Sequence, residues 1–288
     1  MIALPAAIVV ALVLALSGSD DSSRPGAAQA KARVDRFDSK RAWRHLEHQV
    51  GLGPRPAGSE ASRKLASYIR ARLPRGHFQA VPGGLRNVVG RIPGSKPAVV
   101  LAAHYDTKDI PGFVGANDGA AGTAAVLEIA RALRRADRPK GAPEIRFVLF
   151  DGEEATDDER PFRETGLRGS GDYAKRHGAE IRALVLLDFI AEKGAMRIPR
   201  EASSDLALWK RLRAAAKRVG AARAFPDTTQ GAVIDDHTPF LERGVPAIDL
   251  IDFTFPCWHR TCDDLSAVSE RSLDASGETV LELLRTWR

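Results

Sequence analysis

Short apolar runs rich in β-branched residues alternate with helical patterns over most of the chain. The runs that predict strands cover residues 87–92, 98–103, 145–150, 183–187 and 245–251. Apolar residues at helical spacing predict helices over residues 119–135, 169–177, 205–219 and 269–287. This alternation is typical of a parallel sheet with helices on both faces. We therefore expect a single-domain, three-layer α/β/α sandwich with a mainly parallel mixed central sheet.

The part of the chain before the first predicted strand contains two helical stretches, within residues 38–72. Turn-rich residues 51–59 separate them, and Ser59 followed by Glu60 predicts the start of the second helix.

The first residues have a different character. Residues 2–16 are almost wholly apolar, which is short for a membrane span but suits an export signal. No Lys or Arg precedes them, which weakens that interpretation. We expect a signal peptide or uncleaved anchor at 1–17, a polar linker at 18–36 and the main folded domain at 37–288. The protein would then be exported, either to a periplasm or out of the cell.

Composition allows one large core and gives no sign of a nucleic-acid partner. The chain has 288 residues, 44% of them hydrophobic, and a net charge of +6. Its basic residues are scattered at spacings that suit exposed helix faces, without the interleaved aromatic residues that would stack on bases. We therefore predict no nucleic-acid partner, and no membrane contact except an N-terminal anchor.

Acidic residues and histidines directly follow four of the predicted strands. They are His104 and Asp106 after the second, Asp151, Glu153 and Glu154 after the third, Asp188 after the fourth, and residues 252–259 after the last. Open α/β sheets bind ligands beyond the carboxyl ends of their strands. The sequence therefore predicts a polar site at one edge of the sheet.

Glu153 and Glu154 indicate a bound cation. Two adjacent carboxylates after the apolar residues 147–150 would repel each other if both were buried without partners. A metal resolves this, because one carboxylate can bind it while the other acts as general base. Histidine and carboxylate are common zinc ligands. Asp118 alone would be read as a turn residue or helix N-cap, and Asp235 begins a second buried acidic run.

Several motifs resemble the zinc aminopeptidase superfamily, peptidase family M28. In order they are HYDTK (104–108), FVGANDGAAGTAAVLEIARAL (113–133), FVLFDGEEA (147–155), LRGSGDYA (167–174), LVLLDFI (184–190), IDDHTPFLERGVPAIDLI (234–251) and FPCWHRTCDD (255–264). Two branches of that superfamily compete. Aminopeptidases hold two zinc ions and hydrolyse the first peptide bond, whereas glutaminyl-peptide cyclotransferases hold one and convert N-terminal glutamine to pyroglutamate.

Three local features resemble the cyclotransferase branch more closely. Residues 113–116 precede Asp118 as Phe-Val-Gly-Ala, Asp235 stands where aminopeptidases usually carry Ser, and Trp258 precedes His259. The resemblance implies zinc ligands Asp118, Glu154 and His259, with Glu153 as general acid/base. It also implies that Asp188 and Asp235 share a hydrogen-bonded network with Glu153, and that Trp258 forms an aromatic wall beside the substrate. In the aminopeptidase alternative, His104 and Asp188 would complete a second zinc site.

The expected activity is the release of ammonia from the N-terminal glutamine of a peptide or protein, with zinc as cofactor at one ion per chain. One departure from the family pattern is the long, charged segment 155–166, where an aromatic residue is usual and where the sequence does not place Phe162. Cys257 and Cys262 flank His259 and leave three alternatives open: a disulfide, two free thiols or metal ligation.

Other residues receive simpler interpretations. His237 is expected to order the turn at Asp235, and Lys108 and Asp109 are expected in a surface loop. The remaining histidines, His45, His48, His77 and His177, are expected to be solvated, and Trp43, Trp209 and Trp287 to pack in the core.

Overall fold

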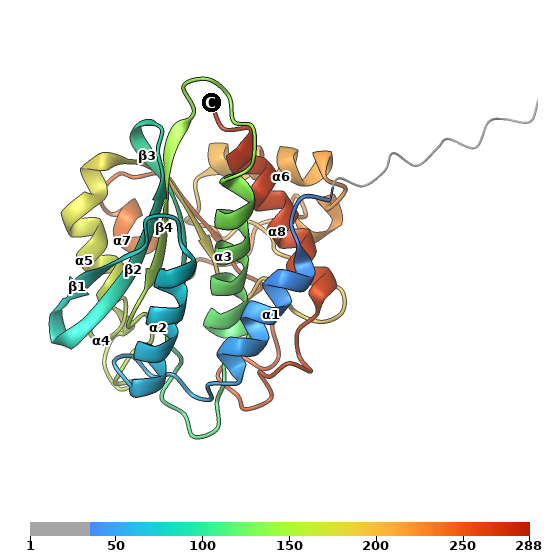
Figure 1. Cartoon of the computed structure of the whole chain (residues 1–288). Helices are drawn as coiled ribbons and strands as arrows, with labels where there is room; N and C mark the ends of the chain where they lie inside the picture. The colour runs from blue at the N-terminus through green and yellow to red at the C-terminus, as the bar shows by residue number, and fades with distance from the viewer. Residues whose placement is uncertain (1–34) are drawn as a thin grey trace, which may run out of the picture. The chain divides into compact units, whose positions relative to one another are not determined.

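A computed structural model describes residues 35–288 and contains a six-stranded sheet (Figure 1). The strands are β1 (His77–Val81), β2 (Leu85–Ile92), β3 (Ser95–His104), β4 (Pro143–Phe150), β5 (Ile181–Leu187) and β6 (Ala247–Leu250), in the order β1-β2-β4-β3-β5-β6. The pairs from β4 through β3 and β5 to β6 are parallel, while β2 is antiparallel to both β1 and β4. The predicted mainly parallel mixed sheet is confirmed.

The strand missing from the sequence prediction is β1, which lies at one edge of the sheet. It joins β2 through the short turn Pro82–Gly84, where Gly83 and Gly84 both have positive φ angles. Only Val81 of its five residues is buried. A mostly exposed edge strand needs no apolar alternation, so its sequence carried no strand pattern.

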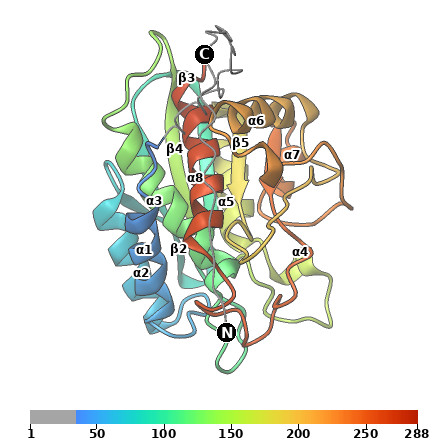
Figure 2. The ribbon, with the colours of Figure 1, turned by 90° about the vertical axis from the view of Figure 1, so that its right-hand side faces the viewer.

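The two faces of the sheet pack against different helices (Figures 1 and 2). One face is covered by α1 (Ser39–Val50), α2 (Glu60–Arg72), α3 (Gly122–Leu133), α6 (Leu206–Arg218) and α8 (Glu270–Arg285). The other face packs against α5 (Arg168–His177) and α7 (Thr238–Leu241). Alternate residues of β3 contribute to the two cores: Leu101 to the first and Val100 to the second. The described residues therefore form the expected three layers.

Four of the eight α-helices in the described residues begin at a residue whose side chain accepts a backbone hydrogen bond, as at Ser59, which accepts from Ser62 N. One boundary prediction is wrong: α3 begins at Gly122, not Gly119. Residues 116–121 form a π-type turn in which Asp118 and Gly119 have non-helical backbone angles. Asp118 is thus neither inside the helix nor its N-cap.

Two of the three tryptophans expected in the core are there. Trp209 and Trp287 are each 2% exposed. Trp43 is only partly buried, and its Nε1 donates to Glu47 on the surface of α1.

The predictions for the signal or anchor at residues 1–17, and for nearly all of the linker at 18–36, lie outside the described residues. Within residues 35–288, no helix combines the length and the apolar character needed to cross a bilayer.

Candidate metal and catalytic site

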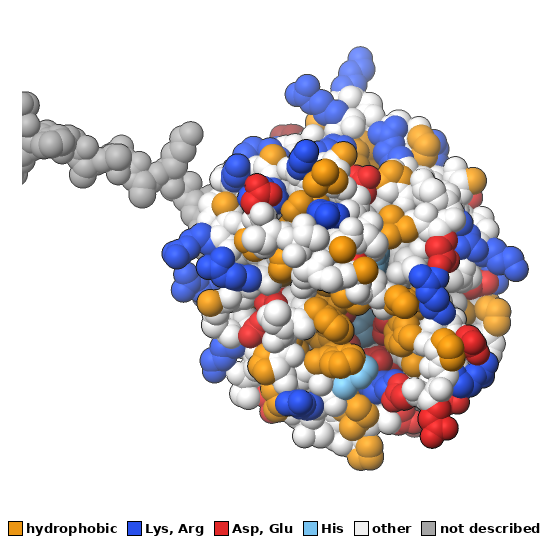
Figure 3. Space-filling view, turned by 180° about the vertical axis from the view of Figure 1, so that it is seen from behind, with side chains coloured by type: hydrophobic (Ala, Val, Ile, Leu, Met, Phe, Trp, Pro, Cys, Tyr) orange, Lys and Arg blue, Asp and Glu red, His pale blue; other side chains and the backbone are white. Residues whose placement is uncertain are grey.

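All seven side chains that the sequence assigned to the site line one cavity of about 350 Å³. They are Asp118, Glu153, Glu154, Asp188, Asp235, Trp258 and His259. They reach it from the loops that follow β3, β4, β5 and β6, and from the turn before α7. Figure 3 shows a face of the molecule where histidine and acidic side chains lie within a hollow bordered by hydrophobic ones. The size is within the range of small-molecule sites.

Asp118, Glu154 and His259 form a set that fits one metal ion. His259 Nε2 lies 3.4 Å from Glu154 Oε2 and 3.7 Å from Asp118 Oδ2. Ligand atoms of a tetrahedral zinc, each about 2.0–2.2 Å from it, are roughly 3.3–3.6 Å apart. Asp118 Oδ2 and Glu154 Oε1 are buried and lack hydrogen-bond partners. A cation among these three side chains would satisfy atoms that the protein leaves without a partner.

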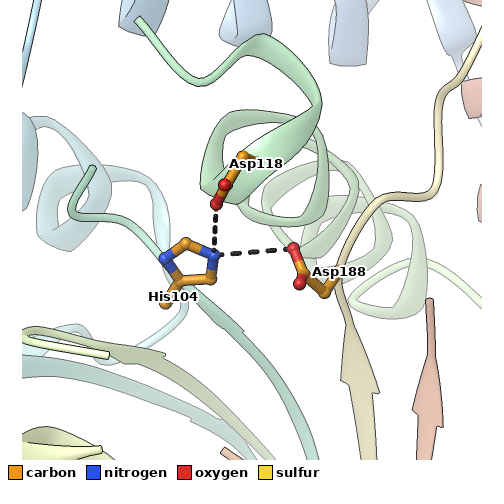
Figure 4. A group of neighbouring side chains, drawn as sticks. All are labelled: His104, Asp118 and Asp188. Carbon is orange, nitrogen blue, oxygen red and sulfur yellow. Dashed lines mark ion pairs between the residues drawn. The ribbon is translucent and has the colours of Figure 1, made fainter. Parts of the chain in front are cut away.

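A second set shares Asp118 with the first (Figure 4). His104 Nε2 lies 3.2 Å from Asp118 Oδ1 and 3.5 Å from Asp188 Oδ1. The two oxygens of Asp118 therefore face different sets, one towards His104 and one towards His259. This arrangement suits either one metal beside a histidine–carboxylate pair or two metals bridged by Asp118.

The turn that carries Asp118 is held from two sides. Asp263, which is fully buried, accepts hydrogen bonds from the backbone N–H groups of Asn117 (2.8 Å) and Asp118 (3.0 Å). Gly119 has a φ of +83°, and a Cβ there would come within 2.9 Å of both Asp106 O and His104 Cε1. Only glycine therefore lets the turn approach the end of β3 this closely.

Asp106 holds the backbone at Glu153 and Glu154, as Asp263 holds the backbone at Asp118. Its two carboxylate oxygens accept the backbone N–H groups of Glu153 (3.2 Å) and Glu154 (3.3 Å). The supporting roles of Asp106 and Asp263 were missed in the sequence. Both residues lie within the motifs quoted above, but nothing in their spacing shows which backbone amides they accept.

His259 sits in a strained and enclosed loop. Its φ is +52°, and Trp258 stacks on its ring at 4.6 Å between centroids. A disulfide joins Cys257 to Cys262 on either side of it. The disulfide alternative is therefore confirmed over free thiols and thiolate ligation.

The acidic side chains around the metal set are poised to hold protons. Burial, together with the neighbouring charge of Glu154, raises the pKa of Glu153 well above its usual value. Burial and the charge of Asp235 likewise raise the pKa of Asp188 to about 7. Asp235 itself is buried and accepts the backbone N–H of Asp236. A carboxyl group with a pKa of about 7, such as that of Asp188, can both take and give a proton near neutral pH.

His237 does not order the Asp235 turn in the expected way. That turn is closed by Thr238, whose hydroxyl accepts from Asp235 N (3.2 Å) and whose N–H donates to Asp235 O (2.8 Å). The fully buried His237 ring instead places Nε2 3.0 Å from the Ser203 hydroxyl and 3.3 Å from Glu201. His237 therefore connects the turn that carries Asp235 to Glu201.

The expected surface position of Lys108 is wrong, while Asp109 is exposed as expected. Lys108 is 6% exposed; its Nζ donates to Ala155 O (2.9 Å) and pairs with Asp158. This fixes the start of the long segment that follows Glu154. Further along that segment, Phe162 begins the short helix α4 (Phe162–Thr165) and lines the same cavity as Trp258. The structure thus brings an aromatic ring to the cavity from a segment whose sequence did not place one.

The histidines far from the site differ from one another. His48 and His77 are exposed, and His177 is partly buried. His45 is half-buried and hydrogen-bonded to the Tyr68 hydroxyl at 2.8 Å, so its expected solvation is not found. Burial and nearby arginines lower the pKa of His45 to about 4.

Comparison with known proteins identifies the family to which this fold and site belong. The sequence matches the model of peptidase family M28 over residues 87–284. This range spans more than half of the chain and includes Asp118, Glu154 and His259. The chain belongs to peptidase family M28.

Similarity to individual proteins indicates the branch of the family in which the chain lies. A glutaminyl-peptide cyclotransferase-like protein of Mus musculus is 30% identical, over 82% of this chain and 73% of its own length. The crystal structure of an Acidobacteriales bacterium glutaminyl cyclase superposes with a TM-score of 0.75 at 32% identity, covering 90% of this chain and 97% of that one. A leucine aminopeptidase precursor from Bacteroides thetaiotaomicron has a TM-score of 0.80 at 26% identity, covering 88% and 99%. Within the family, the chain lies in the glutaminyl-peptide cyclotransferase branch.

Proposed function

We propose that this protein is a zinc-dependent glutaminyl-peptide cyclotransferase. It would convert the N-terminal glutamine of peptides or proteins to pyroglutamate with release of ammonia. The observation that carries the proposal is the joining in one cavity of the metal set, the protonatable Glu153 and the aromatic Trp258. The similarity to a cyclotransferase-like protein and to a glutaminyl cyclase supports it.

Asp118, Glu154 and His259 are the residues that would hold the zinc. Bound there, zinc supplies Lewis-acid polarisation of the glutamine γ-carbonyl. The α-amine and the γ-carbonyl belong to the same residue, so the reaction closes a five-membered ring within the substrate. Proximity of the reacting groups therefore comes mostly from the substrate itself. The cavity must only fix the side chain in a bent conformation and manage the protons.

Glu153 is the proposed carrier of the proton. As a carboxylate it takes a proton from the attacking amine, and as the acid it gives that proton to the departing ammonia. Burial and the neighbouring charge of Glu154 raise its pKa above the usual value, which favours holding the proton between the two steps. Asp188 and Asp235 line the same cavity, and the charge of Asp235 adds to the cost of ionising both Glu153 and Asp188. Trp258 and Phe162 supply apolar walls beside the reacting groups.

The experiment incubates the purified protein with a glutaminyl peptide and follows ammonia release and a mass loss of one ammonia. Zinc content is measured on the same sample. Cyclisation with one zinc per chain is the expected result. Release of free amino acids from unblocked peptides, with two zinc ions per chain, would instead favour the aminopeptidase alternative, in which His104 and Asp188 complete a second site. Removal of the metal by a chelator should abolish the activity, and added zinc should restore it.

We also propose that the protein is exported. The apolar residues 2–16 and the Cys257–Cys262 disulfide support this, since disulfides persist in oxidising compartments. Cell fractionation combined with N-terminal sequencing tests the proposal and separates a cleaved signal from a retained anchor. Recovery of the full chain in the cytosolic fraction would contradict it.

A further inference from the structure

A third group of ligand-type side chains shares no residue with the two metal sets at the catalytic cavity. Asp235, His237 and Asp249, here called the buried set, bring ligand atoms within 4.8 Å of one another. His237 and Asp249 are fully buried, and Asp235 is 3% exposed. Asp249 interrupts the otherwise apolar residues of β6, a position at which an isolated carboxylate is costly. The buried set therefore requires an explanation.

The hydrogen bonds of His237 determine which of its ring nitrogens carries a proton. The Ser203 hydroxyl donates its single hydrogen to Glu201 Oε2 (2.8 Å), because an ionised carboxylate can only accept. The same hydroxyl lies 3.0 Å from His237 Nε2, so there it must accept, and Nε2 must carry a hydrogen. Nε2 also faces Glu201 at 3.3 Å. In the neutral ring, the lone pair is therefore on Nδ1.

That lone pair meets carboxylate oxygens that also lack partners. His237 Nδ1 lies 3.8 Å from Asp249 Oδ2, too far for a hydrogen bond. Nδ1, both oxygens of Asp249 and Asp235 Oδ2 are all buried without a hydrogen-bond partner. No lysine or arginine within residues 35–288 forms an ion pair with any of these side chains. Lone pairs grouped this closely away from water repel one another unless a positive charge lies between them.

We propose that Asp235, His237 and Asp249 bind a divalent transition-metal ion, such as zinc or manganese, at a site separate from the catalytic one. One imidazole and two carboxylates are donors that both ions accept. Glu201 binds the far ring nitrogen of His237, which is the usual arrangement behind a metal-bound histidine. Asp235 lines the catalytic cavity and provides the entry path. The ion would hold the turn before α7 against β6, a structural role that does not depend on the proposed cyclotransferase function.

The test removes the catalytic ligands and measures the metal that remains. In the full chain, Asp118→Ala combined with His259→Ala breaks both metal sets at the catalytic cavity. After loading with Zn²⁺ or Mn²⁺ and desalting, this double variant should retain about one ion per chain. Adding Asp249→Asn should lower the affinity at least about tenfold, whereas the control Glu278→Gln, a buried carboxylate outside all three sets, should not. The zinc of the catalytic cavity is then the difference between wild type and the double variant.

Crystals of the zinc-loaded wild-type protein give a second measurement that does not depend on how the variants fold. An anomalous X-ray peak among Asp235, His237 and Asp249 is expected. No peak there, or metal retention that survives Asp249→Asn, would overturn the inference, and a proton would then be the positive charge in the buried set. Cyclisation of a glutaminyl peptide is assayed separately on the wild type. Its failure would contradict the proposed function, while the metal measurements still decide whether the buried set binds an ion.

Discussion

The inner part of the catalytic cavity and its mouth are built on different principles. Inside, the residues are acidic or imidazole groups that are mostly buried, and second carboxylates position their backbone: Asp263 for Asp118, and Asp106 for Glu153 and Glu154. At the mouth, Ile234, Phe253 and Trp258 are almost half exposed, and packing between rings fixes Phe253 and Trp258. A displaced group inside loses charge stabilisation as well as position, whereas a changed group at the mouth loses only contact area.

The first prediction removes the proposed proton carrier and should have the largest effect. Glu153→Gln keeps the size of the side chain but cannot exchange a proton, so kcat for cyclisation should fall by about 10²–10⁴. Zinc content should stay at the wild-type value, because Glu154 is the proposed ligand. Steady-state kinetics and metal analysis on one preparation check both parts. Loss of the metal in this variant would mean that the roles of the two glutamates are exchanged.

The second prediction concerns Glu201, which His237 connects to the turn that carries Asp235. Burial alone would raise the pKa of Glu201, but hydrogen bonds from His237 and Ser203 outweigh it and lower the pKa to about 2. A folded-state pKa below the usual 4.5 means that the ionised carboxylate stabilises the fold above about pH 4.5, and that this stability is lost as the pH falls towards 2. Glu201→Gln should therefore cost about 3 kcal/mol at pH 7.

The free energy of unfolding, measured with denaturant at several pH values, checks this. The difference between Glu201→Gln and wild type should shrink as the pH falls below about 4.5. Glu60→Gln is the control, because it removes an exposed carboxylate from a surface pair with Lys64 and should change little. A loss of unfolding free energy that does not depend on pH would show that the charge of the Glu201 carboxylate does not stabilise the fold.

The third prediction loosens one ligand without touching it. In Asp263→Asn, the new amide nitrogen cannot accept either of the N–H groups that now donate to Asp263, so the Asp118 turn loses an acceptor. The affinity for zinc should fall by about 10- to 100-fold, as for other groups that orient metal ligands. Competition with a chelator of known affinity measures it. Asp264→Asn changes the neighbouring residue, and wild-type affinity is expected there.

The fourth prediction has the smallest effect and concerns the mouth. Trp258→Ala removes the ring that stacks on His259 and lines the cavity. We expect KM for a glutaminyl peptide to rise by up to about tenfold, since an aromatic contact contributes about 0.5–1.5 kcal/mol beyond its area. A loss of zinc in this variant, seen by metal analysis, would mean that Trp258 acts mainly by supporting His259.

The contrast between the charged inner part of the cavity and its apolar mouth also explains which site residues could be predicted from the sequence. Glu153, Glu154, Asp188 and His259 could be predicted because several apolar strands end in charged residues at one edge of the sheet, whereas Asp118 was predicted only through the family resemblance. Phe253 was not found, since an aromatic residue near a strand end is most often part of a core. Lys108 was wrongly predicted to be exposed, because a lysine in a loop is usually solvated. Only the fold shows that its Nζ donates to Ala155 O and pairs with Asp158.

The errors in the fold prediction have similar causes. The missed β1 carries almost no buried surface, and the late start of α3 follows from non-helical angles at Asp118 and Gly119. Hydrophobic periodicity reports burial, so it does not report an exposed edge or a turn shaped for a ligand. The central strands, which are buried on both faces, were predicted to within a few residues.

The disulfide between Cys257 and Cys262 links the oxidation state of these cysteines to the proposed affinity of the protein for its metal. It closes a short ring that contains His259, the proposed metal ligand, so the oxidised chain would have less conformational entropy to lose if that histidine binds a metal. Thermodynamic reciprocity then requires the converse: a bound metal makes this disulfide harder to reduce. Thiol oxidation and metal loading would therefore be coupled steps in maturation, each making the other more favourable.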